Sequence, residues 1–126
     1  MRWAHGRKEP AMPRESPTTR TLKRCRENGW YAEVVEYWNC FASRRIDLFG
    51  FADVAVITDE HLLLIQCTTR DHGPERFRKI TEERGNVARR LLAVGVRIEV
   101  WGWRKLKTDG WQPKIQAVTL DDWPRF

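Results

Sequence analysis

At 126 residues, the chain is long enough for one hydrophobic core and too short for two, and its 41% hydrophobic residues and seven tryptophans exclude a disordered class. No apolar run approaches the roughly 20 residues that a transmembrane helix needs, so we expect no membrane partner. Residues 1–8 lack the apolar centre of a signal peptide, and the three cysteines are too scattered for a disulfide framework. We therefore expect a cytoplasmic protein.

The positive charge is concentrated at the start of the sequence. The net charge is +6, and residues 1–30 contain eight Lys or Arg residues against three Glu residues. Such a surface suits a polyanion such as DNA or RNA. The alternative is a solvated tail followed by an exposed helix face, and charge alone leaves both interpretations open.

Turn formers and apolar spacing divide the first half of the chain. Residues 1–16 contain glycine and prolines with few apolar anchors, which predicts a flexible basic arm, and residues 17–126 form a single domain. A helix is expected between Pro17 and Gly29. Strand formers then predict a first strand over residues 30–38, followed by a loop over residues 39–50.

The second half contains the strongest signals for strands and helices. Residues 51–58 and 61–68 are nearly all apolar at their centres, which predicts a hairpin of two central strands joined at Asp59-Glu60. Helical spacing predicts a helix over residues 74–94, with Gly85 as a point of interruption, and strands follow from residue 96 and over residues 114–120. The order predicts an α/β fold, a mixed sheet flanked by helices with an extra C-terminal strand.

Polar residues occur at the expected ends of the two central strands. Asp53 opens the first, while Gln66 and Thr68 lie on one face of the second, since strand side chains alternate. These three residues are expected to meet at one edge of the sheet. Each also has a structural explanation: Asp53 as a turn cap, Gln66 as a partner of buried backbone groups, and Thr68 as an ordinary strand-end residue. Asp47 in the preceding loop has one too, as an ion-pair partner of Arg44 or Arg45.

Two motifs carry a resemblance to a known family. The segments Phe51-Ala-Asp53-Val-Ala-Val and Leu64-Ile-Gln66-Cys-Thr68 resemble the PD-(D/E)XK nuclease superfamily, particularly its small Holliday-junction-resolvase-like and phage-encoded members. The resemblance covers roughly residues 17–103 and implies a restriction-endonuclease-like αβββαβ core. Ala52 replaces the usual proline, Gln66 stands at the acidic position, and Thr68 stands at the lysine position. The glutamate that many members carry on the first helix is absent between Thr18 and Arg26.

The resemblance implies a metal-dependent DNA endonuclease of bacterial or phage origin, with branched DNA as one substrate. Mg²⁺, or Mn²⁺ in its place, would be held by oxygen ligands. We predict Asp53, Gln66 and Glu36 as metal ligands, with Asp47 as a further carboxylate and Thr68 completing the catalytic set. Phosphate contacts are expected from a larger set of cations: Arg20, Lys23, Arg24, Arg44, Arg45, Arg70, Arg76 and Lys79.

Two other functions are consistent with the same residues. The Gln66 and Thr68 replacements favour a non-catalytic module that keeps the fold and binds nucleic acid. A protein-interaction subunit, or a homodimer, would instead use an exposed face containing Trp101 and Trp103. Most of the tryptophans are expected to fill the core.

Overall fold

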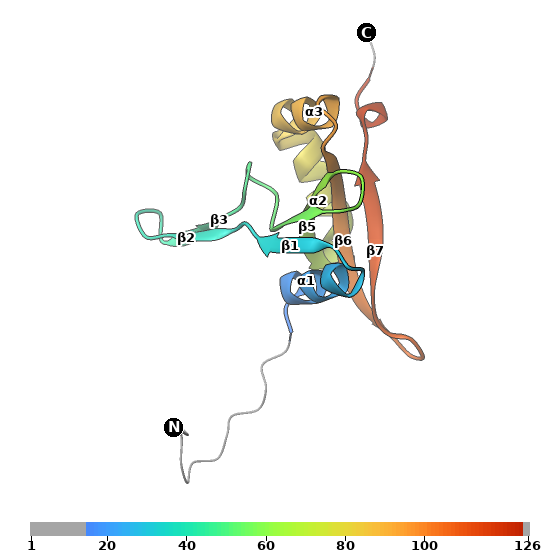
Figure 1. Ribbon diagram of the computed structural model, residues 1–126. Coiled ribbons are helices and arrows are strands. Elements are labelled where there is room, and N and C mark those ends of the chain that lie inside the picture. The colour runs from blue at the N-terminus through green and yellow to red at the C-terminus, as the bar shows by residue number, and fades with distance from the viewer. Residues whose placement is uncertain (1–14, 125–126) are drawn as a thin grey trace.

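The computed structural model describes residues 15–124, so the arm predicted for residues 1–16 lies almost entirely outside the described residues. Within them the fold is α/β, built on a mixed five-stranded sheet with helices packed against it (Figure 1), as predicted. The strands of this sheet are, in spatial order, β1 (Tyr31–Val34), β4 (Val54–Ile57), β5 (Leu62–Thr69), β6 (Arg97–Leu106) and β7 (Gly110–Val118). Only the β5–β6 pair is parallel among these strands.

The first helix, α1 (Pro17–Glu27), forms where the sequence predicts it. The side chain of Ser16 caps it by accepting a hydrogen bond from the Thr19 N–H, and Pro17 occupies the first turn, where its missing N–H costs nothing. Gly29 follows the helix with a φ of +82°, a left-handed conformation that favours glycine and turns the chain into β1.

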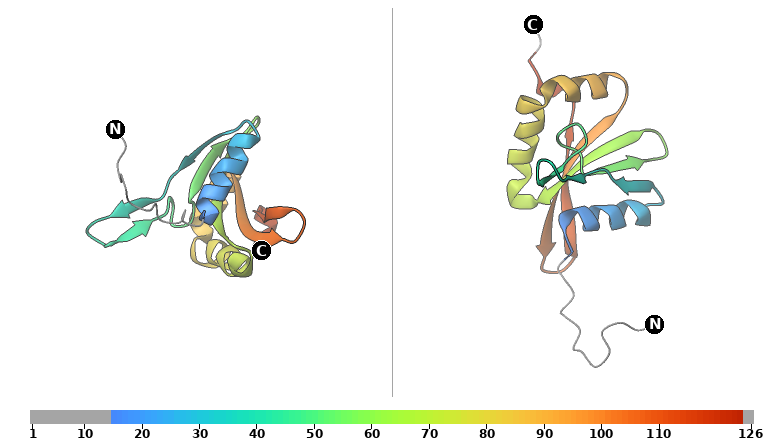
Figure 2. Two further views of the ribbon diagram at one scale, coloured as in Figure 1. Left: turned by 90° about the horizontal axis from the view of Figure 1, so that it is seen from below. Right: turned by 90° about the vertical axis from the view of Figure 1, so that its left-hand side faces the viewer.

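Strand β5 is the centre of the molecule, because residues 63–68 are all buried. On one face of the sheet, Ile65 and Trp101 pack with Cys25 of α1. On the other face, Leu64 and Val100 pack with residues of the later helices. A strand covered on both faces explains the uninterrupted apolar run of its sequence. The two views of Figure 2 show these helices around the sheet.

The helix predicted over residues 74–94 is interrupted beside Gly85, the position that the sequence marks as a point of interruption. The segment contains α2 (Gly73–Arg78), a π-helical turn η2 (Lys79–Glu83) and α3 (Gly85–Ala93), preceded by a short 3-10 turn η1 (Arg70–His72). The break occurs beside Gly85, where a Cβ would lie 3.0 Å from Nε1 of Trp123. That indole donates to the Thr81 carbonyl at 2.9 Å, so its packing explains the interruption. No helix within residues 15–124 has both the length and the apolar character to cross a membrane.

The first strand predicted over residues 30–38 is also divided. Strand β1 ends at Val34, and the Val35 N–H donates to the Asp53 carbonyl at 2.8 Å. The chain then leaves the sheet and forms a separate hairpin of β2 (Tyr37–Asn39) and β3 (Arg44–Ile46), which projects from the body of the protein (Figure 1). The loop predicted for residues 39–50 therefore contains a strand and the tip of a hairpin.

The prediction of an exposed face containing Trp101 and Trp103 is wrong. Both residues instead fill the core, as expected of most of the tryptophans. Both are buried on the α1 face, with ring centroids 6.2 Å apart. Because α1 covers them, they offer no surface to a partner. Strand β7 begins at Gly110 rather than at residue 114, so Trp111 is also part of this strand, which pairs with β6. A 3-10 turn, η3 (Leu120–Asp122), follows β7.

Candidate metal centre

Asp53 is held where a tight turn enters the central sheet. The turn before it contains Phe49 and Gly50 with φ values of 56° and 81°, and the Gly50 N–H donates to the Asp47 carbonyl at 3.0 Å. Ala52 then lies fully buried, and the Asp53 N–H donates to the Ile65 carbonyl of β5 at 2.9 Å. The turn thus fixes Asp53 at the start of β4, facing the same layer as Gln66.

Three carboxylates meet at this point. One oxygen from each of Glu36, Asp47 and Asp53 lies within 4.8 Å of the others. Glu36 lies in the connection from β1 to β2, and Asp47 directly follows β3, so the two ends of the hairpin bring both residues to Asp53. Arg45 pairs with Glu36 at 3.8 Å rather than with Asp47, which corrects the ion pair expected from sequence.

Besides its two acidic neighbours, Asp53 contacts residues of β5 through hydrogen bonds. Its Oδ2 accepts one hydrogen bond from Nε2 of Gln66 at 3.1 Å and another from the Cys67 N–H at 2.8 Å. Gln66 is only 3% exposed, and its Oε1 has no hydrogen-bond partner among residues 15–124. A buried polar atom without a partner carries a desolvation cost, which a bound cation or water would relieve.

The electrostatics of the cluster disfavour three ionised carboxylates. The pKa of Asp53 is raised from 3.8 to about 8, first because burial disfavours its charged form. The neighbouring carboxyl groups of Asp47 and Glu36 raise the pKa of Asp53 further, while the hydrogen bond from the Cys67 N–H opposes the shift. Without a cation, Asp53 therefore holds a proton at neutral pH.

The donor set fits a hard divalent cation. Mg²⁺ and Mn²⁺ prefer oxygen ligands, and the site combines carboxylate oxygens from Glu36, Asp47 and Asp53 with an unsatisfied amide oxygen on Gln66. A cation would also remove the repulsion that raises the Asp53 pKa. The three acidic residues could therefore hold a metal ion, and the amide of Gln66 contacts one of them, Asp53.

The residues predicted for the site divide into two groups. Glu36, Asp47, Asp53 and Gln66 come together, joined by the distances given above. Thr68 is buried two residues beyond Gln66 on the same face of β5. Of the predicted cations, Arg45 contacts the cluster through Glu36, whereas Arg70, Arg76 and Lys79 follow β5 in the η1–α2–η2 segment. Arg76 has a buried Nε without a partner among the described residues.

Sequence reasoning missed one cation near the cluster. The side chain of Arg84 lies against Gly50, so closely that any Cβ at position 50 would collide with the guanidinium. Gly50 belongs to the turn between Asp47 and Asp53, so Arg84 reaches the loop that supplies two of the carboxylates. Nothing in the spacing of Arg84 indicates this role, because the contact depends on the break between η2 and α3.

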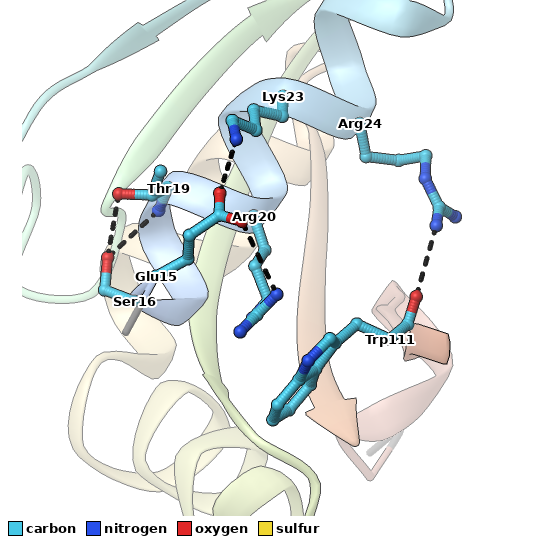
Figure 3. Close-up of polar contacts among 7 residues, drawn as sticks. All are labelled: Glu15, Ser16, Thr19, Arg20, Lys23, Arg24 and Trp111. Carbon is cyan, nitrogen blue, oxygen red and sulfur yellow. Dashed lines mark hydrogen bonds and ion pairs between the residues drawn. The ribbon is translucent and has the colours of Figure 1, made fainter. Parts of the chain in front are cut away.

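The predicted basic residues of α1 lie on another part of the surface, beside β7 (Figure 3). The Arg20 guanidinium stacks 3.7 Å from the centroid of the Trp111 ring, and Arg24 donates to the Trp111 carbonyl at 3.5 Å. Glu15 pairs with Lys23 at 2.7 Å and with Arg20 at 3.9 Å. Arg20 and Arg24 thus contact Trp111, while Lys23 is held beside them by Glu15.

Comparison with known proteins identifies no relative. The chain matches no protein-family model, no curated protein and no solved structure. The chemistry of the site therefore rests on the residues described above.

Proposed function

We propose that the protein is a metal-dependent nuclease that hydrolyses phosphodiester bonds in DNA. The observation that carries this proposal is the cluster of Glu36, Asp47 and Asp53, in which one oxygen from each residue lies within 4.8 Å of the others, with the Gln66 amide hydrogen-bonded to Asp53. Placing the buried carboxyl group of Asp53 beside two further carboxylates is a costly arrangement, and a bound cation would offset that cost.

The order of the elements supports a restriction-endonuclease-like core for this proposal. The chain runs from α1 through β1, β4 and β5 to the helices and then to β6, which is the αβββαβ order of the PD-(D/E)XK nucleases that the sequence resembles. In this interpretation β7 is an added strand and the β2–β3 hairpin is an insertion between the first two core strands. Asp53 then opens the second core strand, and Gln66 lies on the third.

Each residue has a distinct part in the proposed reaction. A Mg²⁺ or Mn²⁺ ion bound here would polarise the scissile phosphate and lower the pKa of a water molecule. Glu36, Asp47 and Asp53 would bind that ion through carboxylate oxygens, and Gln66 would add its amide oxygen while orienting Asp53. Thr68 cannot supply the positive charge of the lysine expected at its position. Arg45, which pairs with Glu36, and Arg84, which lies against Gly50 in the turn, would instead bind the phosphate and stabilise its developing charge.

Cleavage assays test this function. Labelled four-way-junction, duplex and single-stranded DNA are incubated with Mg²⁺, Mn²⁺ or EDTA, using the wild type, Asp53→Asn and Asp59→Asn. Asp59 is exposed in the turn between β4 and β5, so its variant controls for the loss of one negative charge. We expect metal-dependent cleavage by the wild type and Asp59→Asn, and none by Asp53→Asn. Equal cleavage by Asp53→Asn would reject the proposed site.

One observation favours a second candidate, a nuclease fold that binds nucleic acid without cutting it. Gln66 is neutral and donates its amide N–H to Asp53, and the lysine position holds Thr68. Both replacements lower the charge available for catalysis. Binding of DNA without cleavage under every metal condition would favour this second function over the first.

A further inference from the structure

The β2–β3 hairpin, here called the hairpin arm (residues 37–46), has an unusually exposed set of aromatic side chains. Phe41 is 98% exposed, Trp38 is 60% exposed and Tyr37 is 55% exposed. The arm forms its own two-stranded sheet and projects from the body of the protein in Figure 1 and in the left view of Figure 2. A concentration of exposed aromatic rings on a projecting element marks a binding surface.

The local structure presents these rings in a defined way. Oδ1 of Asn39 accepts hydrogen bonds from the N–H groups of Phe41 and Ala42, at 2.9 and 3.0 Å, which orders the tip of the arm. Trp38 lies directly opposite Arg45 in the strand register. The arm therefore holds its aromatic and cationic residues in fixed relation to one another.

The charge of the arm indicates the chemistry of its partner. Arg44 and Arg45 are its only basic residues, and it contains no acidic residue. Nucleic-acid surfaces that bind unpaired bases combine aromatic platforms with cations that contact phosphates. A self-association surface would need no excess of positive charge, and two copies of the arm would repel each other.

The arm is also continuous with the candidate metal centre. Glu36 precedes its first residue and Asp47 follows its last, and both contribute to the acidic cluster with Asp53. Arg45 within the arm reaches Glu36 at 3.8 Å. A nucleotide strand whose bases stack on the arm would therefore place a neighbouring phosphate near the cluster.

We propose that the hairpin arm binds unpaired bases of the nucleic-acid substrate by stacking them on Trp38 and Phe41. This inference deepens the proposed nuclease function, and rests on it for the identity of the substrate as DNA. It defines the substrate class as single-stranded DNA, or DNA with an unpaired segment, rather than continuous duplex. Arg44 contacts the backbone of the same strand.

The test measures binding in EDTA, so that it does not depend on cleavage. Fluorescence polarisation compares a labelled single-stranded oligonucleotide with a duplex of equal length, using the wild type and the double variant Trp38→Ala/Phe41→Ala. Tyr31→Ala is the matched control, because Tyr31 is also an exposed aromatic residue, 79% exposed, but lies in β1 outside the arm. Circular dichroism and thermal unfolding establish that each variant is folded.

We expect the double variant to lose about tenfold or more in affinity for the single strand, since base stacking on one aromatic side chain contributes roughly 1–3 kcal/mol. Its affinity for the duplex and the affinity of Tyr31→Ala for both oligonucleotides should change by about twofold at most. Unchanged single-strand affinity in the double variant overturns the proposal, as does a wild type that binds no single strand.

Sedimentation velocity tests whether the arm is instead a contact between two copies of the chain. If the double variant converts a dimer to a monomer without changing single-strand affinity, the arm is a contact between copies of the chain and the proposal is overturned. The outcomes also separate the arm from the nuclease function. Loss of single-strand binding in the double variant supports base binding by the hairpin arm, even if no metal promotes cleavage. Metal-dependent cleavage with unchanged single-strand binding overturns base binding by the arm and leaves the nuclease function standing.

Discussion

Gln66 donates its amide N–H to Oδ2 of Asp53 at 3.1 Å, and this contact joins the strand β5 to the acidic cluster. The same amide leaves its Oε1 buried and without a partner among the described residues. Gln66 thus orients the carboxyl group of Asp53 through its amide nitrogen, and its amide oxygen remains free to act as a ligand. The relationship makes position 66 the most informative site for substitution after Asp53 itself.

Replacing Gln66 with Glu should tighten metal binding and destabilise the metal-free protein. The substitution adds a carboxylate to a cluster that already has three, so repulsion rises without a cation and attraction rises with one. We expect about a tenfold gain in Mn²⁺ affinity by calorimetry, and a lower melting temperature in EDTA at pH 8. Gln116→Glu, at an exposed position of β7, is the control. Equal affinities in Gln66→Glu and the wild type would show that position 66 does not contact the ion.

The raised pKa of Asp53 predicts how stability depends on pH. Because the folded protein keeps a proton on Asp53 up to about pH 8, whereas the unfolded chain releases it near pH 4, the folded state binds more protons between these values. The stability of the folded state that comes from this extra proton on Asp53 is therefore fully present below about pH 4. It is lost as the pH rises to about 8, so the free energy of unfolding falls over this range. Denaturant titrations in EDTA should show that Asp53→Asn weakens this decline. If the free energy of unfolding falls with pH equally steeply in the wild type and in Asp53→Asn, the raised pKa of Asp53 is contradicted.

Metal should reverse that pH dependence. A cation displaces the proton from Asp53, so the affinity for Mn²⁺ should rise with pH and level off above about pH 8. The measurement is the Mn²⁺-induced rise in melting temperature at several pH values. A rise of the same size at pH 6 and pH 8.5 would show that the ion binds without releasing this proton.

A buried hydrogen-bond chain should stabilise the opposite face of the sheet. The Trp103 indole N–H donates to Oγ1 of Thr21 at 2.8 Å, and that hydroxyl donates to the Pro17 carbonyl at 2.8 Å. Thr21→Val leaves both groups without this partner, so we expect a loss of about 1–3 kcal/mol in the free energy of unfolding. Thr108→Val, at an exposed turn position, should change it by about 0.5 kcal/mol or less. Similar effects in the two variants would contradict this assignment.

The basic surface of α1 should contribute affinity without base preference. Lys23 is exposed beside Arg20, Arg24 and Trp111, a group suited to phosphate contacts. Lys23→Gln should weaken single-strand and duplex binding alike and reduce the slope of log affinity against log salt by about one. Arg97 is an exposed basic residue at the start of β6, outside this group, so Arg97→Gln should leave that slope unchanged. An unchanged slope in Lys23→Gln would exclude this surface from binding.

The sequence predicted the part of the site that depends on neighbouring strands. Continuous apolar runs identified β4 and β5, and their antiparallel pairing, with Val54 opposite Ile65, is what brings Asp53 to Gln66. Strand alternation likewise placed Gln66 and Thr68 on one face.

Other features depend on contacts distant in the chain. The hairpin arm leaves the sheet where Val35 donates to the Asp53 carbonyl, and no residue pattern in the segment from Trp30 to Trp38 signals that exit. Trp101 is buried because α1 crosses its face, which local periodicity does not specify. Arg84 reaches Gly50 because the helix breaks beside it.

Calorimetric titration of Mn²⁺ at pH 8 decides whether Glu36, Asp47 and Asp53 form a divalent metal centre. We expect saturable binding of a single ion per chain to the wild type and to Asp59→Asn, and loss of that binding in Asp53→Asn. Identical binding heats in all three proteins, or none in the wild type, would contradict it.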